Sequence, residues 1–430
     1  MKRRVLKKKF YQEVILDVHG GRNSRRRIVL RFFSLCFKVM GGAVLSLVLV
    51  PLSLFRPIEI WQMQTRRSKI SFFIRDLEYG LKSLKDRKQL GKRFVFVLYP
   101  IRFPNAQLAV MYRRYVTILG KKQKYLAEAF RFVWPIARIE MKGRITVDGP
   151  NRFTIWNQRT PTLTFTEDET LIGNDLDRSM SLGPNQPFVC LAFSSKGYRL
   201  SADLAIDKYN NLGKGESKNL FEIIPKIDTY IPLINEITKK GIAVVRTGIF
   251  EDERLPTNLG NLVHDYSFGA QSPFGDVWLH SRCLFSLAGG GSGSHWFAAI
   301  FNKPCVYTDQ FMIYGSQGDR DLFIMQLPWL LEEQRFATFE WMSRDENIEW
   351  ALHGSRIGVE YELVKNTPSQ LIDVIDEMLQ RLGGTWIETE EDLELQKKFV
   401  EVQQLLPLNG RTPCRMGAKF LREHQYLLPQ

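Results

Sequence analysis

The sequence predicts an α/β fold built on doubly wound parallel sheets, and three observations carry this prediction. Short apolar runs of strand length recur at residues 188–193, 242–245, 283–288 and 305–307. Amphipathic segments of helical length lie between them. The run at 283–288 leads through a Gly/Ser loop and a short helical segment to the next run. Because strand–helix–strand units cross over right-handedly between parallel strands, this order indicates a parallel sheet.

The Gly/Ser loop is the most informative stretch of the chain. Three glycines at 289–291 interrupt any regular element, and Ser292, Gly293 and Ser294 follow before the helix expected at 295–301. Small residues at the carboxyl end of a strand leave backbone N–H groups and a helix N-terminus open to a phosphate. The NTPase, dinucleotide and lipase loop patterns do not match. A tight turn without a ligand fits this segment equally well, and we interpret His295 as a pocket or capping residue.

The net charge of +14 belongs to one end of the chain. Residues 1–100 hold 23 Lys and Arg against 6 Asp and Glu, whereas the remaining residues hold 37 against 40. Because the body of the chain is near neutral, this charge favours an anionic membrane surface over a nucleic-acid groove. The five cysteines form no CxxC pair and leave an odd count, which indicates buried thiols in a reducing compartment.

An uncharged apolar run at 39–55 follows basic clusters within 2–9 and 22–31. Its 17 residues reach only the lower limit for crossing a bilayer of roughly 30 Å. A span would hold the basic N-terminus in the cytoplasm and export the rest of the chain. A re-entrant or interfacial helix would leave the basic N-terminus and the rest of the chain on the cytoplasmic face. A buried core helix is the third interpretation; we predict membrane association and leave its depth open.

Four regions organise the chain. Residues 1–69 form the basic N-terminal segment, 70–186 a first α/β domain, 187–385 a second α/β domain and 386–430 a C-terminal helical segment. The first domain contains one or two basic amphipathic helices at 70–92, a strand at 93–99 and helices at 105–119 and 124–132. A Thr-, Asn- and Pro-rich stretch at 142–187 ends in the expected linker.

Strand ends in the second domain carry the candidate site residues. Lys196 lies in the loop after 188–193, Arg246 ends the run at 242–245, and Ser292 lies in the Gly/Ser loop. Because the carboxyl ends of parallel strands share one edge of a sheet, we expect these loops to converge. Arg suits a bidentate grip on phosphate, although a surface Arg without a ligand is equally common.

The last third of the chain is expected to be mostly helical. A strand at 321–324 leads into a helical, Trp-bearing stretch through Trp341. Thr367 and Pro368 start a helix at 369–382 as N-cap and N1 residues. The segment at 390–428 is helical and amphipathic in pattern.

An ordered set of short stretches extends over some two hundred residues of the second domain. It comprises Tyr230-Ile231-Pro232, Arg246 with Gly248, Asp265-Tyr266, Ser272-Pro273-Phe274 with Asp276, Gly291-Ser292-Gly293, Lys303-Pro304, residues 321–324, Asn366-Thr367-Pro368 and Asp376-Glu377-Met378. In these residues the chain from about Pro187 resembles a family of bacterial glycosyltransferases encoded among surface-polysaccharide genes. Residues 1–186 resemble that family only in layout.

The resemblance implies the GT-B architecture, in which two Rossmann-like domains face each other and the second holds most of the nucleotide-sugar donor. We therefore expect a GT-B-like pair of Rossmann-like domains behind a basic, membrane-associating N-terminal segment. The expected donor-binding residues are Arg246, Gly248, Gly291, Ser292, Gly293, Ser294, Lys196 and Asp276. No catalytic residue, metal ligand or cofactor is assigned.

Two stretches depart from the family pattern. Members often have a His-x-Arg-Asp-like loop where this chain reads Ala192-Phe193-Ser194-Ser195, and a Lys is frequent where this chain has Gln326. Both departures remove charge that could hold a phosphate or sugar. An altered donor or acceptor, or a reduced activity, therefore stays open.

We expect a glycosyltransferase that moves a sugar from a nucleotide-diphosphate donor to a cell-surface glycan or lipid-linked acceptor, at the cytoplasmic face of the bacterial inner membrane. No Asp-x-Asp signature occurs at a strand end, so Arg246 and the backbone of 292–294 are expected to stabilise the leaving diphosphate without a metal. The alternatives are a nucleotide-sugar epimerase of the same architecture and a catalytically degenerate membrane-bound scaffold of a polysaccharide assembly complex. A nucleic-acid partner is not expected, because the positive charge lies beside the apolar run.

Overall fold

The computed structural model describes residues 23–63, 70–99, 101–136, 138–141, 152–158, 160–194, 224–249, 251, 253–310, 318–344, 356–406 and 412–429. Contacts divide the chain into two compact units. Unit 1 comprises Met1–Thr65, Gly91–Arg102 and Tyr115–Met141, and unit 2 comprises Arg66–Leu90, Phe103–Arg114 and Lys142–Gln430. The domain boundaries expected at 69, 186 and 385 stay predictions.

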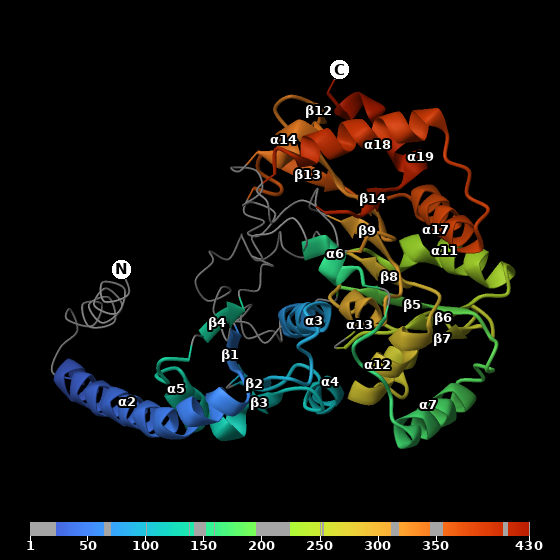
Figure 1. The fold of residues 1–430 in the computed structure, drawn as a ribbon. Coiled ribbons are helices and arrows are strands. Elements are labelled where there is room, and N and C mark those ends of the chain that lie inside the picture. The colour runs from blue at the N-terminus through green and yellow to red at the C-terminus, as the bar shows by residue number, and fades with distance from the viewer. Residues whose placement is uncertain are drawn as a thin grey trace. The chain divides into compact units, whose positions relative to one another are not determined.

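Unit 1 contains a four-stranded, all-parallel sheet in the order β3-β2-β1-β4 (Figure 1). Its strands are β1 (Ile58–Met63), β2 (Phe94–Leu98), β3 (Thr117–Leu119) and β4 (Arg138–Met141). Strand β2 confirms the strand predicted at 93–99. The helix predicted at 105–119 is wrong in its second half, because the β-branched residues Thr117 and Ile118 pair with β2 as a strand.

The long helix α2 (Asn23–Phe55) belongs to unit 1 and extends well beyond the apolar run predicted at 39–55. It packs against helix α5 (Lys124–Phe130), which follows the short 3₁₀ helix η1 (Lys121–Gln123). Leu49 of α2 joins the small core of this unit together with Ile60 and Phe130. The part Val29–Phe55 is long and apolar enough to cross a membrane, by length and composition alone.

Unit 2 contains a seven-stranded sheet in the order β14-β10-β9-β8-β5-β6-β7, and every neighbouring pair is parallel. The strands are β5 (Phe188–Phe193), β6 (Ala243–Arg246), β7 (Val263–His264), β8 (Ser286–Gly289), β9 (Cys305–Gln310), β10 (Leu322–Met325) and β14 (Arg415–Met416). The predicted α/β class with parallel sheets is confirmed. The predicted strand at 188–193 matches β5 residue for residue.

Two pairs of helices cover this sheet. Helix α11 (Ile227–Lys239) contacts α17 (Pro368–Gly383), and helix α12 (Pro273–Arg282) contacts α13 (His295–Ile300). Figure 1 shows the two pairs on different sides of the strands, as right-handed crossovers running in opposite directions require. Thr367 caps α17 through a capping box, which confirms the predicted helix start.

Helix α3 (Ile70–Asp86) confirms an amphipathic helix within the stretch 70–92, and most of it is buried in unit 2. It contacts α13 and α6 (Arg152–Trp156). Lys82 is fully buried, and its Nζ donates to the Trp156 carbonyl at 2.7 Å and to Asn302 Oδ1 at 3.2 Å. The polar stretch at 142–187, whose end was expected to be the linker, contains a capped helix, α7 (Glu167–Ser179).

The helical stretch predicted up to Trp341 is largely wrong. Strands β11 (Leu327–Leu330), β12 (Arg335–Phe336) and β13 (Tyr361–Val364) form an antiparallel sheet in the order β12-β11-β13. Helix α14 (Phe339–Ser343) is the helical part of that stretch. The pairing of β11 with β13, some thirty residues away, overrides the local pattern.

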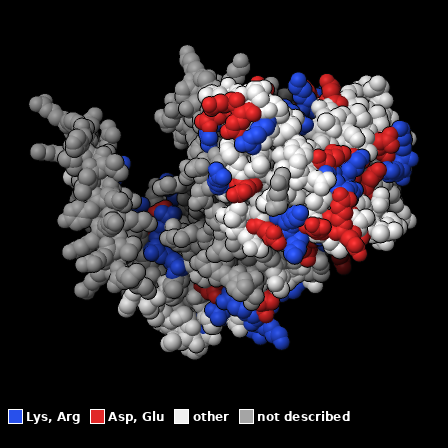
Figure 2. Space-filling model, turned by 90° about the horizontal axis from the view of Figure 1, so that it is seen from above, with Lys and Arg blue, Asp and Glu red and all other residues white. Residues whose placement is uncertain are grey.

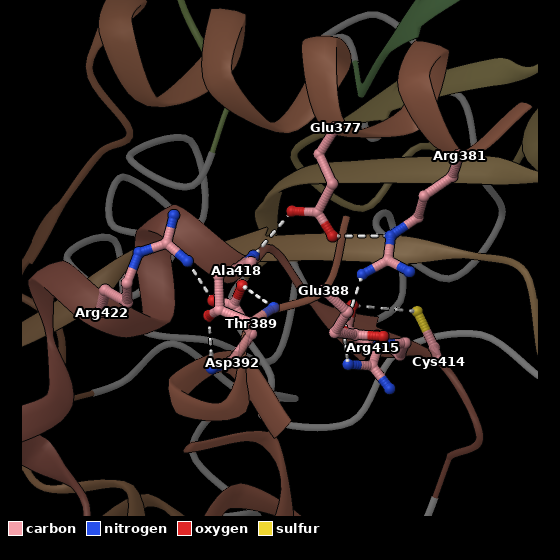
Figure 3. A network of polar contacts seen from close by, with 9 residues as sticks. All are labelled: Glu377, Arg381, Glu388, Thr389, Asp392, Cys414, Arg415, Ala418 and Arg422. Atoms are coloured by element: carbon pink, nitrogen blue, oxygen red, sulfur yellow. Dashed lines mark hydrogen bonds and ion pairs between the residues drawn. The ribbon is translucent and has the colours of Figure 1, made fainter. Parts of the chain in front are cut away.

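The C-terminal segment packs within unit 2 through α18 (Glu390–Gln403), β14, α19 (Ala418–Glu423) and the 3₁₀ helix η3 (Gln425–Leu427). Figure 3 shows the polar network that holds it. Glu377 of α17 accepts from Arg381 Nε at 2.8 Å and from the Ala418 backbone N–H at 2.7 Å. Glu388 accepts from Arg381 and Arg415, so the last strand is tied to α17.

Charged side chains on the face shown in Figure 2 are of both signs and lie intermixed. This agrees with the near-zero balance of the sequence after residue 100.

Candidate functional site

The strand order of unit 2 creates a topological switch point between β5 and β8. Strands β6 and β7 follow β5 outward in one direction, and β9, β10 and β14 follow β8 in the other. Strands β5 and β8 pair directly, ending with Phe193 opposite Gly289. In doubly wound sheets the loops beyond such a pair of carboxyl ends form the ligand-binding crevice.

The Gly/Ser loop leaves the sheet at this switch point. Gly290 and Gly291 adopt left-handed φ angles of 60° and 74°, which favour glycine. The Gly290 N–H donates to the Thr308 carbonyl at 3.0 Å, and the Ser292 N–H donates to the Gly289 carbonyl at 3.3 Å. These bonds fix the loop as a tight turn above the ends of β8 and β9.

Two backbone N–H groups of the loop remain available. Within the part of the chain that the structure describes, the N–H groups of Gly291 and Gly293 donate to no other group. The hydroxyls of Ser292 and Ser294 lie 3.1 Å apart beside them. Successive N–H groups in such a turn form a concavity suited to an anion. Helix α13, which follows, has only six residues, so its dipole adds little to this site.

His295 contacts the backbone of the loop through its ring. Its Nδ1 lies 2.7 Å from the Ser292 carbonyl, a geometry in which the imidazole N–H donates. Burial lowers the pKa of His295 to about 4, so the ring is neutral near pH 7. The N-cap residue of α13 is Ser294, so the interpretation of His295 as a pocket or capping residue stays a prediction.

A buried polar network lies under the loop and was not predicted. Tyr230 of α11 places its hydroxyl 2.6 Å from Thr308 Oγ1 and 2.7 Å from Asp309 Oδ2. Asp309 Oδ1 accepts from the Asn366 N–H at 2.9 Å, and Asn366 Oδ1 accepts from the Asp309 N–H at 2.6 Å. A Cβ on Gly289 would come within 2.9 Å of the Tyr230 hydroxyl, so this position requires glycine.

The network depends on an unusual backbone at the end of β9. Asp309 has a left-handed φ of 49°, and the pairing of β9 with β10 shifts register there. Such a bulge redirects a side chain out of the strand pattern. Burial raises the pKa of Asp309, which the hydrogen bonds from Tyr230 and Asn366 oppose. The signals in the sequence were Tyr230 and Asn366, which belong to the resemblance but carried no assigned role.

Arg246, expected to grip a phosphate, lies at the end of β6 and is 1% exposed. Its guanidinium forms ion pairs with Glu251 at 2.8 Å and Asp265 at 3.6 Å and donates to the Glu253 carbonyl. The side chain therefore organises the loop between β6 and β7. Direct contact between Arg246 and a donor stays a prediction.

Gly248 serves the same loop. Its φ is 142°, and a Cβ there would lie 2.2 Å from Glu251 Oε1. Glycine at this position lets the Glu251 carboxylate reach Arg246. Lys196 lies outside the described residues.

Asp276 occupies the first turn of α12 and is 6% exposed. Burial raises the pKa of its carboxyl to about 7, although Gln271 Nε2 donates to it at 2.9 Å. Its carbonyl accepts from His280 Nδ1 at 2.7 Å, and His280 Nε2 lies 3.5 Å from Thr247 Oγ1. Burial lowers the pKa of His280 to about 4. These groups form a buried polar chain that ends at Thr247, directly after β6.

The described residues contain no group of three or more His, Cys, Asp or Glu side chains arranged to hold a metal ion. The Gly/Ser loop presents backbone N–H groups and hydroxyls, which suit the oxygens of a phosphate or diphosphate.

Comparison with known proteins gives similarities of fold. No protein-family model matches the chain, and no curated protein matches it in sequence. Among solved structures, E. coli ADP-heptose lps heptosyltransferase II is 12% identical, with 75% of this chain and 99% of that chain covered and a TM-score of 0.39. The glycosyl transferase family 9 protein from Veillonella parvula DSM 2008 is 9% identical, with 75% and 97% covered and a TM-score of 0.43.

A third similar structure is the dodecameric iron-containing heptosyltransferase TibC in complex with ADP-D-beta-D-heptose. It is 15% identical, with 76% of this chain and 77% of that chain covered and a TM-score of 0.32. All three are described as glycosyl- or heptosyltransferases. At these identities and TM-scores the similarity concerns the fold alone.

Proposed function

We propose that this protein is a glycosyltransferase whose Gly/Ser loop holds the diphosphate of a nucleotide-sugar donor. The observation that carries the proposal is the pair of available N–H groups, on Gly291 and Gly293, at the switch point of the parallel sheet. The diphosphate is the part of a nucleotide-sugar that requires several hydrogen-bond donors at once.

The chemistry follows from the charge that develops on the leaving group. When the bond between the sugar and the diphosphate breaks, negative charge grows on the phosphate oxygens. Hydrogen-bond donors that already point at those oxygens stabilise the transition state more than the ground state. In this proposal the N–H groups of Gly291 and Gly293 and the hydroxyls of Ser292 and Ser294 supply that stabilisation, and the transfer needs no metal.

The proposed acceptor is a lipid-linked or cell-surface glycan at the cytoplasmic face of the bacterial inner membrane. Support comes from the basic N-terminal hundred residues and from the apolar helix α2 within them. A membrane-bound acceptor gives a reason for both features, whereas a soluble substrate needs neither.

A ligand screen of the full chain in detergent tests this function. Binding to the folded state alone must raise the apparent melting temperature, so we expect one nucleoside diphosphate in a panel to shift it. The matching sugar nucleotides, with ADP-heptoses among the first, are then incubated with membrane lipid extract. We expect release of nucleoside diphosphate that depends on the extract and persists in EDTA.

The other outcomes are equally informative. Conversion of the sugar nucleotide without nucleotide release would identify an epimerase instead. Folded protein that binds no nucleotide would refute the enzyme proposal in favour of a scaffold. Release that EDTA abolishes would refute metal independence only.

A further inference from the structure

Helix α2 presents an apolar face that no described part of the chain covers. Phe33, Met40, Leu47 and Leu54 recur every seven residues, so they share one side of the helix. Their exposed fractions are 57%, 64%, 78% and 83%. Large apolar side chains in such a continuous row indicate a partner that is itself apolar.

The opposite side of α2 is packed on its own unit. Lys38 Nζ lies 3.5 Å from Glu128 of α5, and Leu49 is buried in the core. Between them, a Cβ on Gly42 would lie 2.6 Å from Phe132 Cβ. One turn further, Ser46 Oγ accepts from the Trp134 backbone N–H at 3.0 Å.

This packing covers the middle of the apolar stretch. Gly42 is the central residue of Val29–Phe55, and Lys38 is about 6 Å from it along the axis at 1.5 Å per residue. If α2 crossed a bilayer upright, the ion pair of Lys38 with Glu128 and the backbone around Phe132 would lie near the bilayer centre. Charges and irregular backbone are both costly there when they face lipid.

The distribution of charge on α2 favours a different orientation. Arg31 and Lys38 are the charged residues of Val29–Phe55, and at a seven-residue spacing they lie on one side of the helix with the packed residue Leu49. The apolar side therefore carries no charge. Tyr125 and Trp134, from the segment that contacts α2, are 86% and 78% exposed, and such side chains prefer the membrane–water interface.

We propose that α2 lies in the plane of one leaflet of an anionic bilayer. The row from Phe33 to Leu54 faces the acyl chains, and the side that carries Lys38 faces α5 and the headgroups. Anionic lipid is the fitting surface, because the chain before Arg31 is rich in Lys and Arg. Helix α2 then anchors the protein without crossing the membrane, and this holds whether or not sugar transfer is confirmed.

Depth measurement along the apolar row tests the orientation. Single cysteines replace Phe33, Met40, Leu47 and Leu54 in the full chain carrying Cys36→Ser, since the other four native thiols are buried. Each carries a nitroxide label, and its depth is measured by power saturation in vesicles of 70% phosphatidylcholine and 30% phosphatidylglycerol. We expect all four labels at one similar depth, about 5–10 Å into the headgroup boundary.

Two results would overturn the proposal. Shallow labels at 33 and 54 with deep labels at 40 and 47 would show that α2 spans the bilayer. Labels that broaden one another in the absence of lipid, and gain no depth with vesicles, would show that a second copy of the chain covers the face.

A substitution pair provides an independent check. Leu47→Glu introduces a charge on the apolar row, and we expect vesicle affinity to fall at least roughly tenfold. The matched control is Leu171→Glu, on an exposed leucine of α7 in unit 2, which should leave the affinity unchanged. Equal affinity of the two variants would contradict the assigned face.

Discussion

The buried carboxyl of Asp276 predicts a specific dependence of stability on pH. Burial raises its pKa from an ordinary value of about 3.9 to about 7. The folded protein therefore holds this proton more tightly than the unfolded chain does. The resulting stabilisation is complete below pH 3.9 and is lost as the pH rises through 7. Between pH 5 and pH 8 the two pKa values give a loss of about 2–3 kcal/mol in the free energy of unfolding.

Asp276→Asn isolates that contribution. An amide cannot ionise, so the variant should lack this loss, and the difference from wild type should change by about 2–3 kcal/mol between pH 5 and pH 8. Urea unfolding at half-unit pH intervals measures it. Burial also raises the pKa of the Asp76 carboxyl to about 7. Asp76 is present in both proteins, so its contribution cancels in the difference.

A matched control is Asp175→Asn, which removes an exposed carboxylate of α7 that pairs with Arg178. Its difference from wild type should stay flat over the same range. If the Asp276→Asn difference were also flat, the carboxyl would ionise normally and the burial argument would be refuted.

Two further substitutions test the architecture around the loop. Tyr230→Phe removes the hydroxyl that contacts both Thr308 and Asp309. The free energy of unfolding should fall by about 1–3 kcal/mol, because the buried Asp309 carboxyl loses a hydrogen-bond donor. An unchanged urea midpoint would contradict the network. Thr367→Ala removes the capping box of α17 and should lower the free energy of unfolding by about 1 kcal/mol. Nucleotide affinity measured by titration should be unaltered, and a loss of affinity would place α17 in the binding site.

Much of unit 2 was predictable because its signals are local. The apolar run at 188–193 forms β5, and the Gly/Ser loop, α13 and β9 follow in the predicted order. Thr367 and Pro368 define a helix start by residue type alone. Because the sheet is parallel, the loops that follow its strands are then predicted to lie at one edge of it.

The errors lie where distant pairing decides the structure. Residues 327–330 look helical in context but pair with residues 361–364, and residues 117–119 join β2 across twenty residues. The network under the loop links Tyr230 to Asp309, which periodicity cannot reveal. The ion pairs of Arg246 had a local signal, since Glu251 and Asp265 follow within twenty residues. A buried Arg paired with two carboxylates can organise the chain that follows its own strand without touching a ligand.

A pair of glycine substitutions tests whether the Gly/Ser loop binds the donor diphosphate. Gly291→Asp puts a carboxylate where the phosphates are expected. At roughly 5 Å and an effective dielectric constant of about 20, its repulsion costs about 3 kcal/mol per charge, or about a hundredfold in affinity.

Gly241→Asp is the control, because Gly241 has a φ of 73° against 74° for Gly291, and a Cβ added at Gly241 would lie in open space. It precedes β6, at the opposite edge of the sheet. Calorimetric titration of both variants with the nucleoside diphosphate that stabilises the wild type should give a loss of about a hundredfold for Gly291→Asp and none for Gly241→Asp. Equal affinity of the two variants would contradict the assignment of the loop as the donor site.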